Sequence, residues 1–470
     1  MTKQAIKYED VSAEPVKSFF VDMLTRDIDL GDAILDLLDN CVDGILRKKS
    51  HVSGKHPYQG FYAEVNYNGD EFTITDNCGG IPWDLHDYAF RMGPAGPKPR
   101  RSIPTVGVYG IGMKRALFKI GQHSLIRTQH KNDAYEVEIK PTWLKEEGNW
   151  TMPVHASKSR MGQDGTSIVI RELNEGAKSL FGDDKTRFDR DFKSKLEGHY
   201  AFIINKGFEV KVNGDAIKPR PTELRFEKGE GKTAIRPFIY ETEVDGVEVF
   251  LAVGFTHPIP SEDDITAEQE HKQYSSLDAG WTVVCNDRAV LYCDRTELTG
   301  WGEAGVPKYH TQFIAISGIV EFRSNDASKL PTTTTKRGID ASSRLYLQVK
   351  NKMREGLGIF TSFTNKWKGR QLAKQAQNLI RRAEPQSFHE LKERSANLTL
   401  STVSTGAKGR QFKPRLPMPR KSIGDTQRIC FDKYTKDIRD VSDHLFGDSD
   451  VDASRVGSRC FDHVLEEARK

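Results

Sequence analysis

The sequence predicts an α/β protein with more than one domain. At 470 residues, 37% hydrophobic and 29% charged, it is typical of a globular protein of roughly three domains. A helical apolar pattern over residues 31–44 is followed by segments with strand alternation, at residues 72–76, 123–128, 135–139 and 165–170. We therefore expect an α/β sandwich with a mostly antiparallel sheet in the N-terminal part.

The helix over residues 31–44 gathers polar side chains on one side. Its apolar residues recur at helical spacing and are Ile34, Leu37, Leu38 and Val42. Asp36, Asn40 and Asp43 then stack along the other side, three and four residues apart. A carboxylate one turn before an amide suits a site where the amide oxygen helps hold Mg²⁺ and the carboxylate orients water. The alternative is an amphipathic helix with a solvated polar face.

Two glycine-containing segments follow this helix. Asp-Asn-Cys-Gly-Gly at residues 76–80 ends a strand, which puts Asp76 at a strand-to-loop corner. Three glycines in residues 107–112 precede a helical pattern over residues 113–120, and Lys114 lies beside them. Backbone N–H groups at a helix start suit phosphates. Singly, these features are equally those of an ordinary turn aspartate and a flexible connection.

Taken together and in this order, the three motifs resemble the ATP-binding fold of the GHKL superfamily of gyrase, the ninety-kilodalton heat-shock chaperone, histidine kinases and MutL. The segment over residues 109–121 looks most like the microrchidia branch. The resemblance implies an ATPase that uses ATP and Mg²⁺. It makes Asp36 the general base or water-orienting group, Asn40 the Mg²⁺ ligand, and Asp43 part of the nucleotide site.

The resemblance also assigns the remaining nucleotide contacts. Asp76 accepts a hydrogen bond from the adenine amino group, Gly80 lets the backbone approach the base, and Thr166 lies near adenine through a water. The residues expected to wrap the phosphates are Gly107, Gly110, Gly112 and Lys114. For Thr166, an ordinary strand residue is the alternative.

Two positions depart from the pattern of the family. Asp36 stands where glutamate is more usual, which places its carboxylate about one methylene farther from the attacking water, so turnover is expected to be slow. Cys78 replaces the first glycine of the corner, and Gly79 is expected to take over the unusual backbone angle.

We expect five regions along the chain. They are a GHKL ATP-binding domain at 1–195, an α/β transducer domain at 196–345, a helical segment at 346–395, a basic linker at 396–422 and a small helical module at 423–470. The C-terminal region as a whole is expected to be mainly helical and basic. Residues 1–30 either cross onto a partner subunit or pack as a helix on their own domain.

The second domain is expected to be rich in strands. These lie at residues 247–253, 281–285, 289–292 and 313–322. Their order resembles the ribosomal-protein-like transducer domain that follows the ATPase domain in MutL, gyrase and microrchidia proteins. By that resemblance Lys336, in a Pro-Thr loop, reaches back to the γ-phosphate, with Arg337 as a substitute; otherwise Lys336 is a surface lysine.

Charge points to one basic stretch. The net charge is only +4, but residues 366–421 contain 14 basic and 3 acidic residues. Such a stretch should seek the phosphates of nucleic acid, although a solvated spacer is the alternative. Residues 423–470, in contrast, contain 11 acidic and 8 basic residues.

The remaining expectations concern the environment of the protein. Residues 91–104 mix glycine, proline and positive charge and are expected to form a mobile lid over the nucleotide. Six scattered cysteines predict reduced thiols. We expect a cytoplasmic protein, because neither a membrane span nor the apolar core of a signal peptide is apparent.

The leading functional hypothesis is an ATP-dependent homodimeric clamp acting on DNA, in DNA repair or bacterial defence. An ATP-driven chaperone is one alternative, and a nucleotide-sensing subunit of a larger complex is another. A histidine kinase fits less well, because a transducer-like domain stands in place of dimerisation helices with a phospho-accepting histidine.

Overall fold

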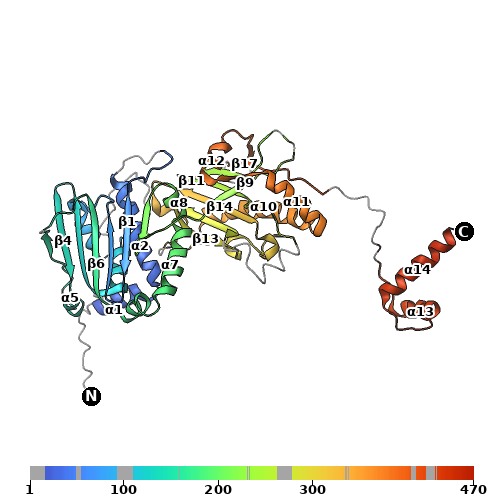
Figure 1. The fold of residues 1–470 in the computed structure, drawn as a ribbon, viewed down its shortest axis with the longest axis horizontal. Coiled ribbons are helices and arrows are strands. Elements are labelled where there is room, and N and C mark those ends of the chain that lie inside the picture. The colour runs from blue at the N-terminus through green and yellow to red at the C-terminus, as the bar shows by residue number, and fades with distance from the viewer. Residues whose placement is uncertain are drawn as a thin grey trace, which may run out of the picture. The chain divides into compact units, whose positions relative to one another are not determined.

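The protein is described here by a computed structural model. It describes residues 16–48, 54–92, 110–157, 159–229, 231, 233–261, 278–333, 336, 338–403, 409–419, 429 and 431–469. The chain divides into two compact units, residues 1–418 and residues 419–470. The first unit contains two lobes, each built on its own β-sheet (Figure 1).

The first lobe is built on an eight-stranded sheet of order β5-β4-β3-β6-β2-β1-β7-β8. Its strands are β1 (Tyr62–Tyr67), β2 (Glu71–Asp76), β3 (Gly121–His130), β4 (Asp133–Ile139), β5 (Val154–Ala156), β6 (Gly165–Leu173), β7 (Glu209–Val212) and β8 (Asp215–Ala216). Neighbouring strands are antiparallel except β1 and β7, which run parallel. The expected mixed α/β architecture with a mostly antiparallel sheet is therefore confirmed for this lobe.

Helices cover one face of this sheet (Figure 1). They are α1 (Lys17–Arg26), α2 (Leu30–Lys48), α3 (His86–Phe90), α4 (Gly112–Ile120), α5 (Pro141–Lys145), α6 (Glu175–Phe181), α7 (Lys185–His199) and α8 (Ala201–Asn205), with a 3₁₀ turn η1 (Trp83–Leu85). Buried and half-buried residues alternate along β1 and β2, as in strands with one covered face. The helix expected at 31–44 is therefore the central part of α2, packed on a sheet.

Helix α1 packs on its own lobe. The Lys17 ammonium donates to the carbonyls of Trp143, at 2.7 Å, and Glu146, at 2.6 Å. The Lys119 ammonium donates to the carbonyl of Thr25, at 3.0 Å. The described part of the N-terminal extension thus follows the second of the two alternatives, a helix on its own domain.

The first lobe extends beyond residue 195, where the sequence was expected to pass into a second domain. Strand β7 pairs with β1, and its Val210 and Val212 are buried in the core of the first lobe. Pairing with β1, which lies far away in the sequence, joins β7 to the first sheet. No local sequence pattern indicates which sheet β7 joins.

The second lobe is built on a seven-stranded sheet of order β13-β12-β14-β11-β10-β17-β16. Its strands are β10 (Phe238–Val244), β11 (Val247–Phe255), β12 (Gly280–Cys285), β13 (Arg288–Asp294), β14 (Ile316–Arg323), β16 (Ser401–Val403) and β17 (Gly409–Phe412). Only β12 and β14 are parallel neighbours in this described sheet. Strands β11 to β14 correspond to the four segments expected from the sequence.

Both faces of this second sheet are covered. The helices of the region are α10 (Arg344–Lys366), α11 (Arg370–Arg382) and α12 (Phe388–Ser395); short elements are η3 (Glu297–Thr299), η4 (Thr311–Phe313), η5 (Ala327–Lys329) and the strand pair β9 (Glu223–Phe226) with β15 (Glu384–Ser387). Helix α10 packs on one face, while α8 and α12 contribute to the core on the other. Helix α8 of the first lobe therefore joins the two lobes.

Part of the expected linker at 396–422 is structured. Strand β17 pairs with β10, and β16 pairs with β17 at the edge of the second sheet. These short strands take their stability from pairing with a neighbour, so their own sequence pattern is weak. Pairing between β17 and β10 draws residues 409–412 into the second lobe.

The second unit contains two helices, α13 (Thr435–Phe446) and α14 (Ala453–Ala468). Gly447 ends α13 with φ +66°, and the Asp452 carboxylate caps α14 by accepting from the N–H of Ser454, at 3.0 Å. Among the described helices of the chain, none combines the length and the hydropathy needed to cross a lipid bilayer.

Candidate functional site

Helix α2 supplies most of the candidate site. Its apolar side packs into the core of the first lobe, while its carboxylates Asp36 and Asp39 contact α4 and the second lobe. Asp36 and Asp43 are buried, whereas Asn40 between them is exposed. The expected row of three polar side chains is therefore present, and its middle member, the amide of Asn40, is exposed.

A pocket lies beside this row, between α2, the end of β2 and the start of β6. It is lined by Leu37, Asn40, Cys41, Gly44, Arg47, Ile74, Asp76, Cys78, Gly80, Ile81, Met113, Thr166 and Ile168. Four of the residues predicted from the sequence, Asn40, Asp76, Gly80 and Thr166, thus surround one cavity although they come from distant parts of the chain.

Asp76 is the buried acceptor of this pocket. Its Oδ1 accepts from the N–H of Cys78 at 2.7 Å, and its Oδ2 lies 3.5 Å from the thiol of Cys41. Burial raises the pKa of Asp76 to about 6, although hydrogen bonds from Cys78, Cys41 and Thr166 oppose the shift. A carboxylate kept dry in an apolar pocket is a strong acceptor for a ligand that brings a donor.

Glycine is required where the chain turns below the pocket. Gly79 and Gly80 have φ of +100° and +64°, whereas Cys78 is not among the residues with positive φ. The expectation that Gly79 replaces the missing first glycine is therefore confirmed. A Cβ at Gly80 would lie 2.0 Å from the carbonyl oxygen of Gln129, so any larger residue would push this corner away from β3.

The three glycines expected to wrap the phosphates are only partly described. Gly107 lies outside the described residues, Gly110 has φ +67°, and Gly112 begins α4 against the side chain of Asp36. Lys114 is buried, and its ammonium donates to the carbonyls of Ala89, at 2.8 Å, and Gly110. Burial lowers the pKa of Lys114 to about 8. Its side chain does not line the pocket in this structure.

Asp36 forms a buried ion pair that the sequence analysis missed. Its Oδ2 accepts from Nη2 of Arg115, which stands in the first turn of α4. Nε of Arg115 is buried and has no hydrogen-bond partner among the described residues. An arginine directly after the predicted phosphate-binding lysine was the available signal. The guanidinium fixes the carboxylate of Asp36, the candidate general base, and its Nε–H is not used in a hydrogen bond.

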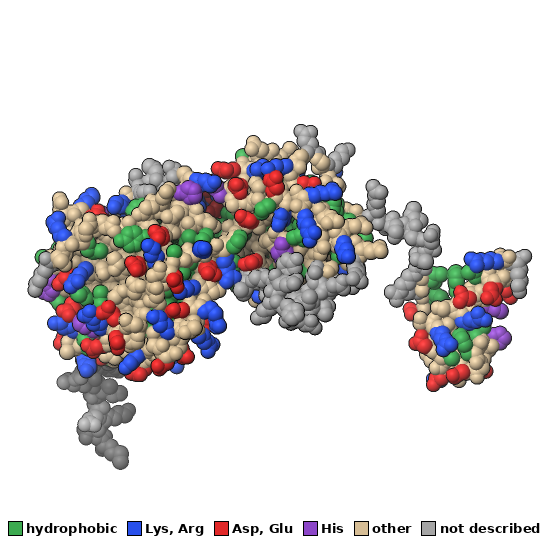
Figure 2. Space-filling view, viewed as in Figure 1, with side chains coloured by type: hydrophobic (Ala, Val, Ile, Leu, Met, Phe, Trp, Pro, Cys, Tyr) green, Lys and Arg blue, Asp and Glu red, His purple; other side chains and the backbone are tan. Residues whose placement is uncertain are grey.

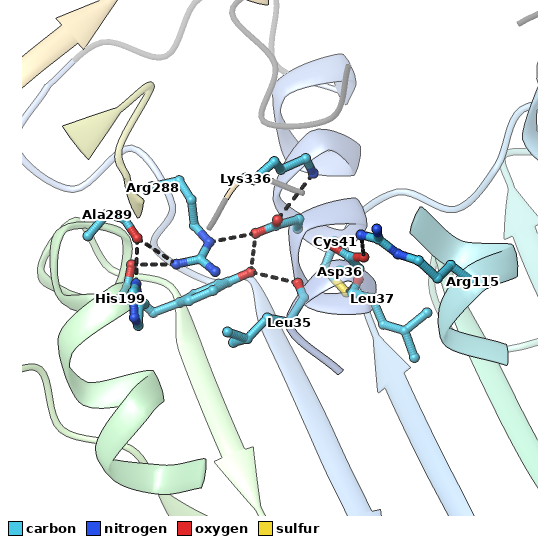
Figure 3. A network of polar contacts seen from close by, with 11 residues as sticks. Leu35, Asp36, Leu37, Cys41, Arg115, His199, Arg288, Ala289 and Lys336 are labelled. Atoms are coloured by element: carbon cyan, nitrogen blue, oxygen red, sulfur yellow. Dashed lines mark hydrogen bonds and ion pairs between the residues drawn. The ribbon is translucent and has the colours of Figure 1, made fainter. Parts of the chain in front are cut away.

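Asp39 is the second missed residue, and it joins the two lobes through Arg288 and Lys336, both of which are labelled in Figure 3. Its Oδ1 accepts from the hydroxyl of Tyr200 at 2.6 Å and from Nε of Arg288 at 3.0 Å. Its Oδ2 accepts from Nζ of Lys336, at 3.1 Å. Lys336 therefore reaches from the second lobe to α2, one turn from Asp36, as a lysine that senses the ligand of α2 would need to do.

Residues 28–167 match the model of a family described as histidine kinase-, DNA gyrase B-, and HSP90-like ATPase. This match supports the GHKL superfamily for the first lobe. It also supports ATP binding by this part of the chain. A comparison with curated proteins finds no match to the chain.

The residues of the GHKL-type pocket fit ATP and Mg²⁺. Apolar walls around one buried carboxylate suit a planar heterocycle with an amino group. Among the described residues no group of three or more His, Cys, Asp or Glu could hold a metal ion. The exposed amide of Asn40 could hold an ion such as Mg²⁺, which usually keeps waters and phosphate oxygens as its other ligands.

Proposed function

We propose that this protein is a Mg²⁺-dependent ATPase whose nucleotide state opens and closes a dimeric clamp on DNA, in DNA repair or bacterial defence. One observation carries the proposal: Lys336 of the second lobe contacts the same helix that offers Asn40 to the pocket of Asp76. A contact of this kind gives the second lobe a means of sensing what the first lobe binds.

Four residues form the adenine site in this proposal. The Asp76 carboxylate accepts from the amino group of adenine, and Thr166 beside it orients a water toward the ring. Gly80 has no side chain, so the backbone after β2 leaves room for the adenine ring to enter the pocket. The hydroxyl of Thr128 supports Thr166 at 3.3 Å and accepts from the N–H of Ile81 at 2.8 Å, which fixes this side of the pocket.

The phosphates lie toward α2 and the lid. Asn40 holds the metal, Asp43 lies beside it, and Gly107, Gly110, Gly112 and Lys114 provide the phosphate contacts. Lys114 must leave the carbonyls that it now contacts to take this role. Bound Mg²⁺ would neutralise phosphate charge and help orient the transferred group.

Asp36 acts on the attacking water. Its carboxylate accepts the proton of that water or orients it, while Arg115 holds the carboxylate in place. Because the aspartate side chain is shorter than the usual glutamate, the water is held less closely and turnover is slow. Lys336 contacts the γ-phosphate from the second lobe, which acts as a transducer.

DNA contacts are proposed for α11 and its surroundings. Three exposed cations of α11, Lys374, Arg381 and Arg382, have no carboxylate partner among the described residues. Some other cations of the basic stretch are paired with carboxylates: Lys392 with Glu321 at 2.7 Å and Lys413 with Glu355 at 3.3 Å. Lys and Arg side chains gather over this part of the second lobe in Figure 2. Helix α11 therefore concentrates the charge available to phosphates.

Replacing Lys374, Arg381 and Arg382 together by Ala should weaken DNA binding without much sequence preference. Each lost phosphate contact lowers the slope of log affinity against log salt by about 1, so the triple variant should lose a slope of about 3. Fluorescence anisotropy with duplex DNA across a salt series, in ADP and in a non-hydrolysable ATP analogue, measures this slope.

A matched control removes surface arginines elsewhere. Arg187 and Arg190 of α7 are exposed, and their replacement by Ala should leave the salt slope unchanged. An unchanged slope in the α11 variant would remove α11 from the DNA surface. Equal DNA affinity in both nucleotides would remove the gating by ATP.

A further inference from the structure

Asp39 is a buried carboxylate that receives three donors from three different elements. Its side chain is only 1% exposed, and it meets Tyr200 at the end of α7, Arg288 at the start of β13, and Lys336 in the loop after β14. A buried carboxylate requires such compensation, because an unpaired charge is costly in the interior. Burial raises its pKa, but Lys336, Arg288 and Tyr200 outweigh this effect and lower it.

Of the two cations on Asp39, Arg288 is the fixed one. Its Nη1 also donates to the carbonyls of His199, at 3.2 Å, and Ala289, at 2.9 Å. Its guanidinium lies over the ring of Tyr200, 4.8 Å from the centroid. Arg288 stands next to the turn formed by Asn286 and Asp287, where φ is +47° and +72°, and this turn holds β12 to β13. We therefore expect Arg288 to keep its hydrogen bond to Asp39 when Lys336 moves away.

Lys336 is held by fewer contacts. Among the described residues, its ammonium contacts no acceptor besides Oδ2 of Asp39. Burial disfavours its charge, yet Asp39 first, and then Asp36 and Asp43, outweigh burial and raise the pKa of Lys336. The ammonium therefore remains charged beside the carboxylates of α2, and it can leave one of them for a stronger anion.

We propose that Asp39 is a positioning residue that holds Lys336 at α2 until a γ-phosphate competes for its ammonium. Arg288 and Tyr200 keep Asp39 compensated after the lysine leaves, so the exchange does not strand a buried charge. This inference rests on the proposed contact of Lys336 with the γ-phosphate.

The consequence is that the contact between Asp39 and Lys336 limits how much more tightly ATP binds than ADP. Moving Lys336 to the γ-phosphate breaks its bond to Asp39, so part of the gain from the new contact is offset by the loss of the old one. The strength of the Asp39 contact therefore sets the ratio of ATP to ADP affinity. ADP makes no γ-phosphate contact, so its affinity should not depend on Asp39.

Two substitutions at this network should act in opposite directions. Asp39→Asn keeps the shape and an acceptor for Arg288 but removes the charge that holds Lys336. The substitution should raise the ratio of the affinity for a non-hydrolysable ATP analogue to the affinity for ADP by about fivefold. This change lies within the usual range of coupling between sites. Tyr200→Phe removes a donor that shares the Asp39 charge, so Asp39 should hold Lys336 more tightly and the ratio should fall.

Calorimetric titration of the full chain with ADP and with the ATP analogue, both with Mg²⁺, gives this ratio. The Asp39→Asn substitution is also measured in the Lys336→Ala background, where its effect on the ratio should vanish. An ADP affinity equal to that of the wild type shows that each variant keeps a folded site. If Asp39→Asn does not fold, the falling ratio in Tyr200→Phe carries the test.

The outcomes separate the inference from the proposed function. An equal effect of Asp39→Asn with and without Lys336, or an unchanged or lowered ratio in Asp39→Asn, would overturn the positioning role of Asp39. An unchanged ratio in Lys336→Ala alone would instead overturn the γ-phosphate contact itself. An unchanged or raised ratio in Tyr200→Phe would also contradict the inference.

Discussion

Asp36→Asn should abolish ATP turnover while nucleotide binding is retained. In the proposed mechanism the carboxylate acts on the attacking water and not on the base, so its loss should lower kcat by about 10² to 10⁴ and leave the affinity for nucleotide nearly unchanged. The amide keeps the shape of the side chain and one acceptor for Arg115. Phosphate release at saturating ATP gives kcat, and calorimetry with a non-hydrolysable analogue gives the affinity.

Asp32→Asn is the matched control for this substitution. Asp32 lies on the same helix, is also buried and pairs with Lys195, but it stands about two turns from Asn40, whereas Asp36 stands about one turn from it. Its variant should turn over ATP like the wild type. Normal turnover in Asp36→Asn would exclude Asp36 from the mechanism, and a large loss of affinity would assign it to binding instead.

Asp76→Asn should weaken nucleotide binding by about 10- to 100-fold, the usual cost of losing a charged hydrogen bond in a buried site. The N–H of Cys78 fixes an oxygen at the Oδ1 position, so the amide nitrogen of the variant takes the Oδ2 position. An acceptor for the amino group of adenine is thereby replaced by a donor. Calorimetry measures the loss, and thermal unfolding checks that the variant is folded.

The same carboxylate predicts a pH dependence. Burial raises the pKa of Asp76 to about 6, so the accepting, ionised form prevails above that pH and is lost below it. Affinity should therefore fall by up to about tenfold for each pH unit below 6. Nucleotide phosphates also take up a proton near pH 6, so the profile of Asp76→Asn, which retains only the phosphate contribution, is subtracted. Identical profiles for the two proteins would contradict the role of Asp76.

Local periodicity was sufficient to predict α2, the corner of Asp76 and helix α4. Each is a short segment in which the spacing of apolar residues or the position of glycine decides the structure. The gathering of Asn40, Asp76, Gly80 and Thr166 around one pocket follows from the order of these elements in a known architecture. Their roles toward ATP remain predictions.

Contacts across long stretches of sequence could not be predicted. Arg115 meets Asp36 from 79 residues away, and Arg288 meets Asp39 from 249 residues away. The position of Arg115 directly after Lys114 was a weak signal, but neither pair could be recognised from its own segment, because lysine, arginine and aspartate are common on solvated surfaces. Strands β7 and β17 were misplaced for the same reason: each is defined by a partner strand in a distant part of the chain.

The mass of the protein in solution tests the ATP-gated clamp most directly. Light scattering should give a dimer with a non-hydrolysable ATP analogue and mostly a monomer with ADP, because in this proposal only the γ-phosphate draws Lys336 and the second lobe into a closed state. Lys336→Ala should bind nucleotide and yet remain monomeric with the analogue. If the wild type has the same mass in both nucleotides, the clamp is contradicted, and a constitutive assembly or a nucleotide sensor becomes the better account.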